Sequence, residues 1–521
     1  MDTLITIVFT LPAVVKATLL HSLWLSSTSS KWDLKTALVI AFLRSSFDSP
    51  VKKSITDLQK AWGKDHPVKG PLWRSDATIK APPEDDVRQK LLKTVEELSV
   101  TGKETYKIPE SVDITAEWHG LRSGVKSDTP EPKELSNEAK YQKLLAETTS
   151  DAVVLYFHGG AFFIMDPSSH RGITAKLAPQ IGGRVFSVRY RLAPQNPFPA
   201  ALLDAVTAYL TLLHPPPGSL HKPVSASKII LAGDSAGGNL VLALTQVLLQ
   251  WQRTARTGTT DADAVPVVRF HGENVAVPMP AGISPFSPWT DLTRSLPSLV
   301  ENTRYDYLPA PDELSRPKAD SKSSGKKSGT KLLKERHPFP QDEVWPADPL
   351  RTDLYSDGSA LMHPLVSPLA MRSDGWADAP PTLFIVGQEI MNDEMGLQAN
   401  KMAKAGVKVR WEQWEAMPHV FGLILGELHP TTIGRAVFER WGIWARQVLS
   451  LTEGSLEAPA EGHAETDALT GVVEVAAKTF KVRELPRGFD DVTSVSDEQA
   501  LELMRAAKER LCAAEPAPRE A

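Results

Sequence analysis

The sequence predicts an α/β fold in which a mostly parallel sheet is covered by helices on both faces. Short, largely apolar runs, typical of buried strands, alternate with longer segments of helical periodicity. This alternation indicates strands that are joined by helical crossovers. Strands are expected at 112–119, 152–157, 184–188, 228–232, 280–283, 382–386 and 407–411, and helices at 202–213 and 239–251.

Composition narrows the class of protein. A length of 521 residues allows one large α/β domain with insertions or two to three smaller units, and a hydrophobic content of 42% suffices for a buried core. The net charge of −5 is small for this length and gives no indication of a nucleic-acid partner. Because Cys512 is the only cysteine, an intramolecular disulfide and a cysteine-based zinc site are excluded.

A G-x-S-x-G motif separates one predicted strand from the helix that follows it. Residues 233–237 directly follow the apolar run 229–232. Such a sharp turn forces the serine into a strained conformation, and glycines two positions away on either side avoid a collision. The motif predicts that Ser235 is held at the edge of the sheet as a nucleophile, and an ordinary Gly-rich loop is the alternative.

A serine hydroxyl is a weak nucleophile at neutral pH, so Ser235 requires a base. Folds with this kind of turn use the chain order serine, acid, histidine. His419 lies in a loop after the predicted strand 407–411. An imidazole with a pKa of about 6.5 can accept the serine proton and return it to a leaving group. We therefore expect His419 to be the base, although a structural histidine is the simpler alternative.

The acid has two candidates. Glu389 lies closest to the end of the strand that precedes it, where a third group would face the histidine. Asp393 is the alternative acid, but it can equally cap the helix that begins beside it. Glu389 is preferred.

Two successive glycines follow His158 and the buried strand before it. Without a Cβ, their amides can approach a substrate closely. The amides of Gly159, Gly160 and Ala236 are predicted to form an oxyanion hole, in which each donor stabilises the transition state by about 3 kcal/mol. His158 is expected to support this loop, and no metal role is expected for it because no partner ligand lies at a suitable spacing.

Linked motifs in this order resemble the hormone-sensitive lipase family of α/β-hydrolases over about residues 110–450. The resemblance implies an eight-stranded, mostly parallel sheet, a helical cap and ester hydrolysis through an acyl-enzyme without a metal or organic cofactor. The motifs are HGGA at 158–161, YRLAP at 190–194 with PFPA at 197–200, GDSAGG at 233–238, SPWTDL at 287–292 and HPLVSPL at 363–369.

The same resemblance bears on the acid and on the oxyanion loop. The usual family stretch is Asp-Pro-Leu-x-Asp-Glu, whose first Asp belongs to the triad, and residues 389–394 align with it. Glu389 replaces that Asp, 30 residues before His419, and Ile390 replaces the Pro. Ala161 stands where the family commonly has a third glycine.

The regions around this core are expected to form separate parts of the chain. Residues 1–110 are predicted to be a helical cap or a membrane-associated region, residues 111–450 the catalytic domain, and residues 451–521 a partly disordered tail with a helix at 497–513. A cap segment at 295–360 contains a basic insertion, 315–336, with eight basic and two acidic residues. The insertion is expected to be disordered, with contact to an anionic membrane as the alternative.

The apolar segment 4–25 has two interpretations. Lys16 and His21 interrupt it, and its uncharged run is shorter than the ~20 residues of a simple spanning helix. No basic start and no small-residue cleavage site indicate a signal peptide. The segment is predicted either to associate with a membrane surface or to cover the protein's own acyl pocket. In layout, this apolar segment and the basic insertion resemble those of fungal family members, including steryl-acetate deacetylases that are associated with the endoplasmic reticulum. The expected location is therefore the endoplasmic reticulum membrane, with the cytoplasm as the alternative.

The predicted function is the hydrolysis of a carboxylic ester, an esterase or lipase activity on a lipophilic or short-acyl ester such as a sterol acetate. An amide hydrolase with the same triad, similar to arylformamidases or deacetylases, is the second hypothesis. A non-catalytic ligand receptor on the same fold is the third, but such receptors usually lose the serine or the histidine, and both Ser235 and His419 are present.

Overall fold

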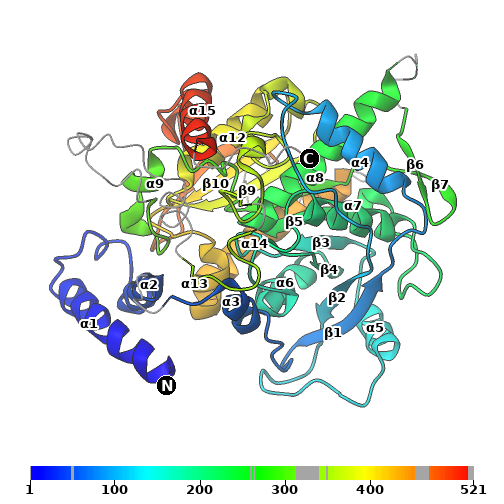
Figure 1. The fold of residues 1–521 in the computed structure, drawn as a ribbon. Helices are drawn as coiled ribbons and strands as arrows, with labels where there is room; N and C mark the ends of the chain where they lie inside the picture. Colours follow the sequence, from blue (N-terminus) through cyan, green and yellow to red (C-terminus); the bar gives the residue numbers. More distant parts are fainter. Residues whose placement is uncertain are drawn as a thin grey trace.

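The computed structural model describes residues 2–47, 52–257, 261, 264–311, 339–347, 350–451 and 469–513. A twisted ten-stranded sheet forms the centre of this part of the chain (Figure 1). In spatial order its strands are β1 (Leu72–Ile79), β2 (Ile114–Leu121), β4 (Arg184–Arg189), β3 (Val153–Phe157), β5 (Ile229–Asp234), β8 (Gly282–Phe286), β9 (Thr382–Gly387), β10 (Val409–Trp414), β11 (Gly471–Val475) and β12 (Val482–Glu484).

The sheet is mostly parallel, as the sequence predicts. All neighbours from β4 to β11 run parallel, and only β1, β2 and β12 pair antiparallel. The seven predicted strands are confirmed as β2, β3, β4, β5, β8, β9 and β10, with ends within three residues of the expected positions. Parallel strands bring their carboxyl ends to one edge, so the loops after β3, β5, β8 and β9 meet there.

Helices cover both faces of the sheet (Figure 1). Alternate residues of β3 and β5 point to opposite sides: Leu155 and Leu231 join one apolar core, whereas Tyr156 and Ile230 join the other. The first core lies under α4 (Asp86–Glu97), α7 (Ala200–Leu213), α8 (Ala236–Arg256) and α12 (Asn392–Lys404), and the second lies under α6 (Arg171–Gln180), α13 (Phe421–Leu428) and α14 (Arg435–Leu451). Smaller elements at the periphery are α5 (Asn137–Ala146), α9 (Ser298–Glu301) and the hairpin β6 (Val267–Phe270) with β7 (Glu273–Ala276).

The sheet extends past the domain limits expected at residues 110 and 450. β1 lies in the region that was expected to be helical, and β11 and β12 lie in the expected tail, so the described sheet has ten strands rather than eight. β1 carries Arg74, Ser75 and Asp76 in its middle, so its apolar pattern is broken, and pairing with β2 defines it instead. β11 is short and extends the parallel sheet beside β10. The helix expected near the C-terminus is confirmed as α15 (Asp497–Cys512).

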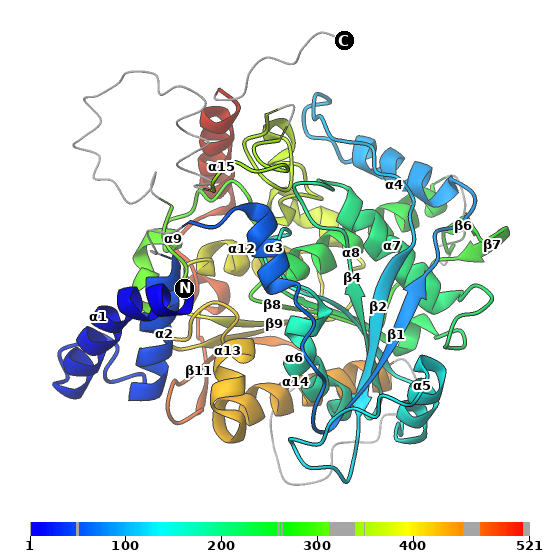
Figure 2. The ribbon, with the colours of Figure 1, turned by 60° about the horizontal axis from the view of Figure 1, so that its bottom comes forward.

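The first residues form a pair of helices at the outer edge of the molecule, α1 (Asp2–Ser22) and α2 (Leu34–Phe47), followed by α3 (Ile55–Trp62) (Figure 2). Among the residues that the structure describes, no helix combines the length and the apolar character needed to cross a bilayer. The basic insertion expected at 315–336 lies outside the described residues.

Candidate active site

Ser235 occupies a strained turn between β5 and α8. Its backbone has φ +52° and ψ −116°, a conformation that is unfavourable for a residue with a side chain. A Cβ at Gly237 would collide with the carbonyl oxygen of Phe157, and one at Gly233 would lie 2.6 Å from the same oxygen. The glycines of the motif are therefore required by the neighbouring strand β3, and the turn presents the serine at the carboxyl end of the sheet.

His419 joins Ser235 to Glu389. The Nε2 atom of His419 lies 2.9 Å from Ser235 Oγ, and its Nδ1 atom lies 2.9 Å from Glu389 Oε1. All three side chains are buried, and Ser235 is the most exposed of them at 9%. Because an ionised carboxylate only accepts hydrogen bonds, Nδ1 carries the proton toward Glu389, and Nε2 is left to accept one from the serine hydroxyl.

The other two carboxylates after β9 make different contacts. Asp393 accepts hydrogen bonds from the Ser298 amide at 2.9 Å and from the Thr493 hydroxyl at 2.7 Å. Glu394 accepts the Thr290 amide at 2.6 Å. Of the two candidate acids, only Glu389 contacts the histidine, and Asp393 connects α12 with neighbouring loops.

Ser287, at the end of β8, orients the acid. Its hydroxyl donates to the second carboxylate oxygen of Glu389 at 2.9 Å and accepts the amide of Val420, the residue after His419, at 3.2 Å. Asn302 donates its side-chain amide to the backbone oxygen of Glu389 at 2.9 Å. The glutamate is thus fixed at its carboxylate and at its backbone.

The charges around His419 favour its protonated form. Burial alone would lower the pKa of His419, but the adjacent Glu389 carboxylate and its hydrogen bond raise it above the ordinary value. Burial raises the pKa of Glu389, and the hydrogen bonds from His419 and Ser287 oppose that rise. The buried carboxylate of Glu389 therefore faces the His419 ring, which must carry a positive charge during proton transfer.

The loop after β3 offers amide donors, but not all the predicted ones. The Gly159 amide donates to Asp234 Oδ1 at 3.1 Å, so the expectation that it is an oxyanion donor is wrong for this structure. Among the described residues the amides of Gly160 and Ala161 have no acceptor, and both residues have positive φ, at +103° and +50°. Ala236 is the first residue of α8, where an amide has no acceptor within the helix.

His158 makes contacts within this loop and with Tyr190. Its Nδ1 donates to the Gly159 carbonyl at 2.7 Å, and its ring stacks on Tyr190 with centroids 4.3 Å apart. The Tyr190 hydroxyl donates back to the His158 carbonyl at 2.7 Å. Burial and the nearby His170 lower the pKa of His158 to about 4, so the ring is neutral at pH 7.

Two further residues, Asp234 and Ser287, contribute to the site although the sequence pattern does not predict them. Asp234 lies inside the G-x-S-x-G motif and accepts hydrogen bonds from the Tyr156 hydroxyl and from the Gly159 amide. Ser287 lies in the SPWTDL motif directly after a predicted strand, which is the signal that could have marked it.

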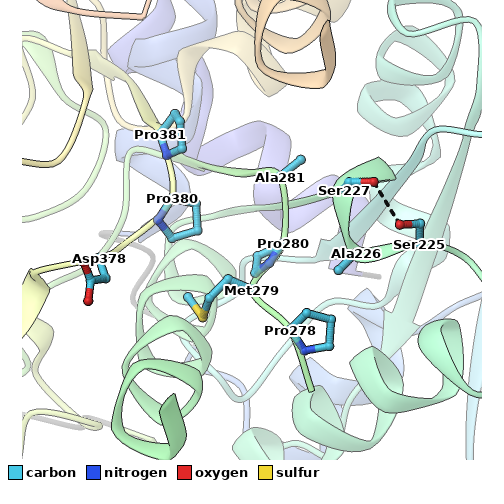
Figure 3. Close-up of a pocket in the computed structure, with 10 residues that line it drawn as sticks. All are labelled: Ser225, Ala226, Ser227, Pro278, Met279, Pro280, Ala281, Asp378, Pro380 and Pro381. Carbon is cyan, nitrogen blue, oxygen red and sulfur yellow. Dashed lines mark hydrogen bonds between the residues drawn. The ribbon is translucent and has the colours of Figure 1, made fainter. Parts of the chain in front are cut away.

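A hollow of about 370 Å³ lies at the opposite edge of the sheet (Figure 3). Its lining includes Ala226 before β5, Pro280 before β8 and Pro381 before β9, all at the amino ends of the strands. Ser235 and Glu389 follow the carboxyl ends, so this hollow is separate from them. Within the described ranges, no three His, Cys, Asp or Glu side chains gather as metal ligands would.

Comparison with known proteins identifies the family. The α/β hydrolase fold family matches residues 154–316 and 324–423, half of the chain, and the chain belongs to it. An acetyl-hydrolase of Streptomyces hygroscopicus is 29% identical over 271 residues, which are 51% of this chain and 67% of that protein. Mouse hormone-sensitive lipase is 37% identical over 99 residues, 18% of this chain and 12% of that protein.

Solved structures show the same fold. The esterase EstE5, soaked with p-nitrophenyl butyrate, covers 80% of this chain and 100% of its own with 21% identity and a TM-score of 0.50. A mutant of the esterase E40 covers the same shares with 23% identity and a TM-score of 0.50. The chain is therefore similar in sequence to esterases and lipases, and it shares the α/β-hydrolase fold with the solved esterases.

Proposed function

We propose that this protein hydrolyses carboxylic esters by nucleophilic catalysis at Ser235. The observation that carries the proposal is the unbroken chain of hydrogen bonds from Ser235 through His419 to Glu389, two contacts of 2.9 Å each. Such a chain supplies a nucleophile, a base and a group that fixes the base.

The first half-reaction forms an acyl-enzyme. Ser235 Oγ attacks the ester carbonyl carbon while His419 Nε2 takes its proton. The negative charge that develops on the carbonyl oxygen is stabilised by backbone amides, for which we assign Gly160, Ala161 and Ala236. The tetrahedral intermediate collapses when His419 returns the proton to the departing alkoxide, and the alcohol leaves.

The second half-reaction repeats these steps with water. His419 removes a proton from water as its oxygen attacks the acyl carbon, and the same amides hold the oxyanion. Collapse expels Ser235 Oγ, which recovers its proton from His419, and the carboxylic acid is released. Glu389 remains ionised throughout and stabilises the imidazolium in both halves.

The substrate is a lipophilic ester with a short acyl group, of which a sterol acetate is one example. Aromatic rings near the base support a lipophilic substrate: the Tyr307 centroid lies 6.4 Å from that of His419, and Phe47 stacks on Tyr307 at 6.1 Å. The name of the Streptomyces relative, an acetyl-hydrolase, supports a short acyl group. The likeness in layout to fungal steryl-acetate deacetylases stays a prediction.

We assign the cap to the first part of the chain together with residues after β8. Arg44 of α2 donates to the backbone oxygens of Asp306 and Thr303 at 2.7 and 2.9 Å. Gln59 of α3 donates to the carbonyl of Phe163, in the oxyanion loop, at 3.0 Å. α2 and α3, rather than α1, therefore adjoin the two sides of the site.

The test is a comparison of matched substrates. The purified protein is assayed on p-nitrophenyl esters of increasing acyl length, on sterol acetates and on the corresponding anilides, with Ser235→Ala as the control. We expect turnover of short-acyl esters that vanishes in the variant. Anilide turnover equal to ester turnover would favour an amide hydrolase, and ester turnover retained by Ser235→Ala would contradict the assigned nucleophile.

A further inference from the structure

The outer helix of the N-terminal pair exposes a continuous apolar surface. Residues 11, 15, 19 and 23 recur every fourth position, so their side chains lie along one side of α1 and its end. The exposed fractions are 58% for Leu19 and 70% for Trp24. We call this surface the α1 face; it consists of Leu11, Val15, Leu19, Leu23, Trp24 and Leu25.

Nothing in the described part of the chain covers the α1 face. α1 packs against α2, and α2 lies between α1 and the body of the molecule in both orientations (Figures 1 and 2). Exposed large apolar side chains normally occur singly on a soluble protein, and a contiguous group marks a surface that binds something.

Charge indicates what binds there. The helix pair and its turn, residues 2–47, contain four Lys or Arg and two Asp, and Lys31 among them is paired with Glu415. Lys16 is exposed on α1, and the Lys478 ammonium lies 5.7 Å from the centroid of the Trp24 ring. Lysines beside a tryptophan and leucines match the boundary between headgroups and acyl chains of an anionic bilayer, where apolar groups enter the lipid and cations stay with the phosphates.

The same pair of helices is bonded to the loops that hold the catalytic groups. The Trp32 indole N–H, in the turn between α1 and α2, donates to the Ala416 carbonyl at 2.7 Å, three residues before His419. At the other end of α2, Phe47 is 46% exposed and stacks on the partly buried Tyr307 beside His419. Phe47 and Tyr307 thus form a short run of rings from the helix pair to the base.

We propose that the α1 face lies flat on an anionic phospholipid bilayer and that lipid-dissolved esters reach Ser235 past Phe47 and Tyr307. Docking of the α1 face depends only on that surface, whereas the ester route rests on the proposed function. Contact is in the plane of the interface, because the helix presents one apolar side with Lys16 next to it.

The first experiment measures flotation of the full chain with vesicles of phosphatidylcholine alone or mixed with phosphatidylserine. The test variant is Leu19→Glu with Trp24→Glu. The matched control is Val100→Glu with Ile108→Glu, two residues that are 56% and 61% exposed elsewhere on the surface. We expect wild type and control to float with the anionic vesicles, less so at high salt, and the test variant to lose at least about tenfold in affinity.

Three results would overturn docking: no flotation of the wild type, equal flotation of the test variant, or a dimer that the test variant dissociates in size-exclusion chromatography. The last result would assign the α1 face to a second copy of the chain. The Ser235→Ala variant should float like the wild type, so a failed function and a failed docking surface are distinguishable.

The second experiment tests the route. The test variant should turn over water-soluble p-nitrophenyl acetate at the wild-type rate but lose at least about tenfold on an ester dissolved in anionic vesicles, in line with its loss of binding. Equal rates of the wild type and the test variant on the vesicle-dissolved ester would contradict delivery from the bilayer.

Discussion

Replacing Glu389 by Gln removes a negative charge from behind His419 and nearly preserves the shape of the side chain. The carboxylate oxygen lies 2.9 Å from Nδ1 and is completely buried, so solvent does not screen the interaction. For charge centres about 4 Å apart at an effective dielectric constant near 20, the attraction is about 4 kcal/mol. Because 1.36 kcal/mol corresponds to tenfold in rate, we expect kcat to fall about a thousandfold.

The assay is steady-state hydrolysis of a short-acyl p-nitrophenyl ester, with circular dichroism to confirm folding. Asp393→Asn is the matched control, because Asp393 contacts Ser298 and Thr493 rather than the base. It should lower stability and leave kcat near the wild-type value. A greater loss of kcat in Asp393→Asn than in Glu389→Gln would refute the assignment of the acid.

Three further predictions follow from the same contacts. Ser287→Ala removes the donor to the buried carboxylate, a bond worth about 1.5–3 kcal/mol, so kcat should fall about tenfold or more with KM unchanged. The control Ser284→Ala, in the strand β8 that precedes Ser287, should leave kcat near the wild-type value, and equal losses in the two variants would count against a positioning role. Glu389 raises the pKa of His419, and the histidine must be neutral to act as a base, so kcat/KM should fall at acidic pH with a midpoint above pH 6.5. The variant Glu389→Gln should move that midpoint to lower pH. A midpoint that does not move would show that another group titrates. Arg171→Ala leaves the buried Glu117 without its bidentate partner and should lower the free energy of unfolding by about 3–5 kcal/mol in denaturant titration, with a change below 1 kcal/mol as the contrary result.

Much of the sheet could be predicted because each buried parallel strand is recognisable in the sequence as a short apolar run. β1 could not, since its middle residues are polar and its strand conformation depends on pairing with β2. The same holds for β11, whose place beside β10 depends on contacts between distant parts of the chain.

In the site, too, features that depend on neighbouring residues could be predicted, and features that depend on distant residues could not. Glu389 could be predicted because it lies next to the end of β9, so its nearness to the sheet edge is a local property. The engagement of the Gly159 amide could not, because its acceptor Asp234 is 75 residues away. Ser287 is 102 residues from the carboxylate that it holds, and neither spacing nor residue type reveals that pairing.

The central claim is that Ser235 is the nucleophile of an acyl-transfer site. The most direct measurement is labelling of the full chain with a fluorophosphonate, which reacts with activated serines, followed by mass spectrometry of the modified peptide. The account predicts a single adduct on Ser235, slower labelling of Glu389→Gln and none of Ser235→Ala. Equal labelling of wild type and Ser235→Ala, or no labelling of a protein that hydrolyses esters, would contradict it.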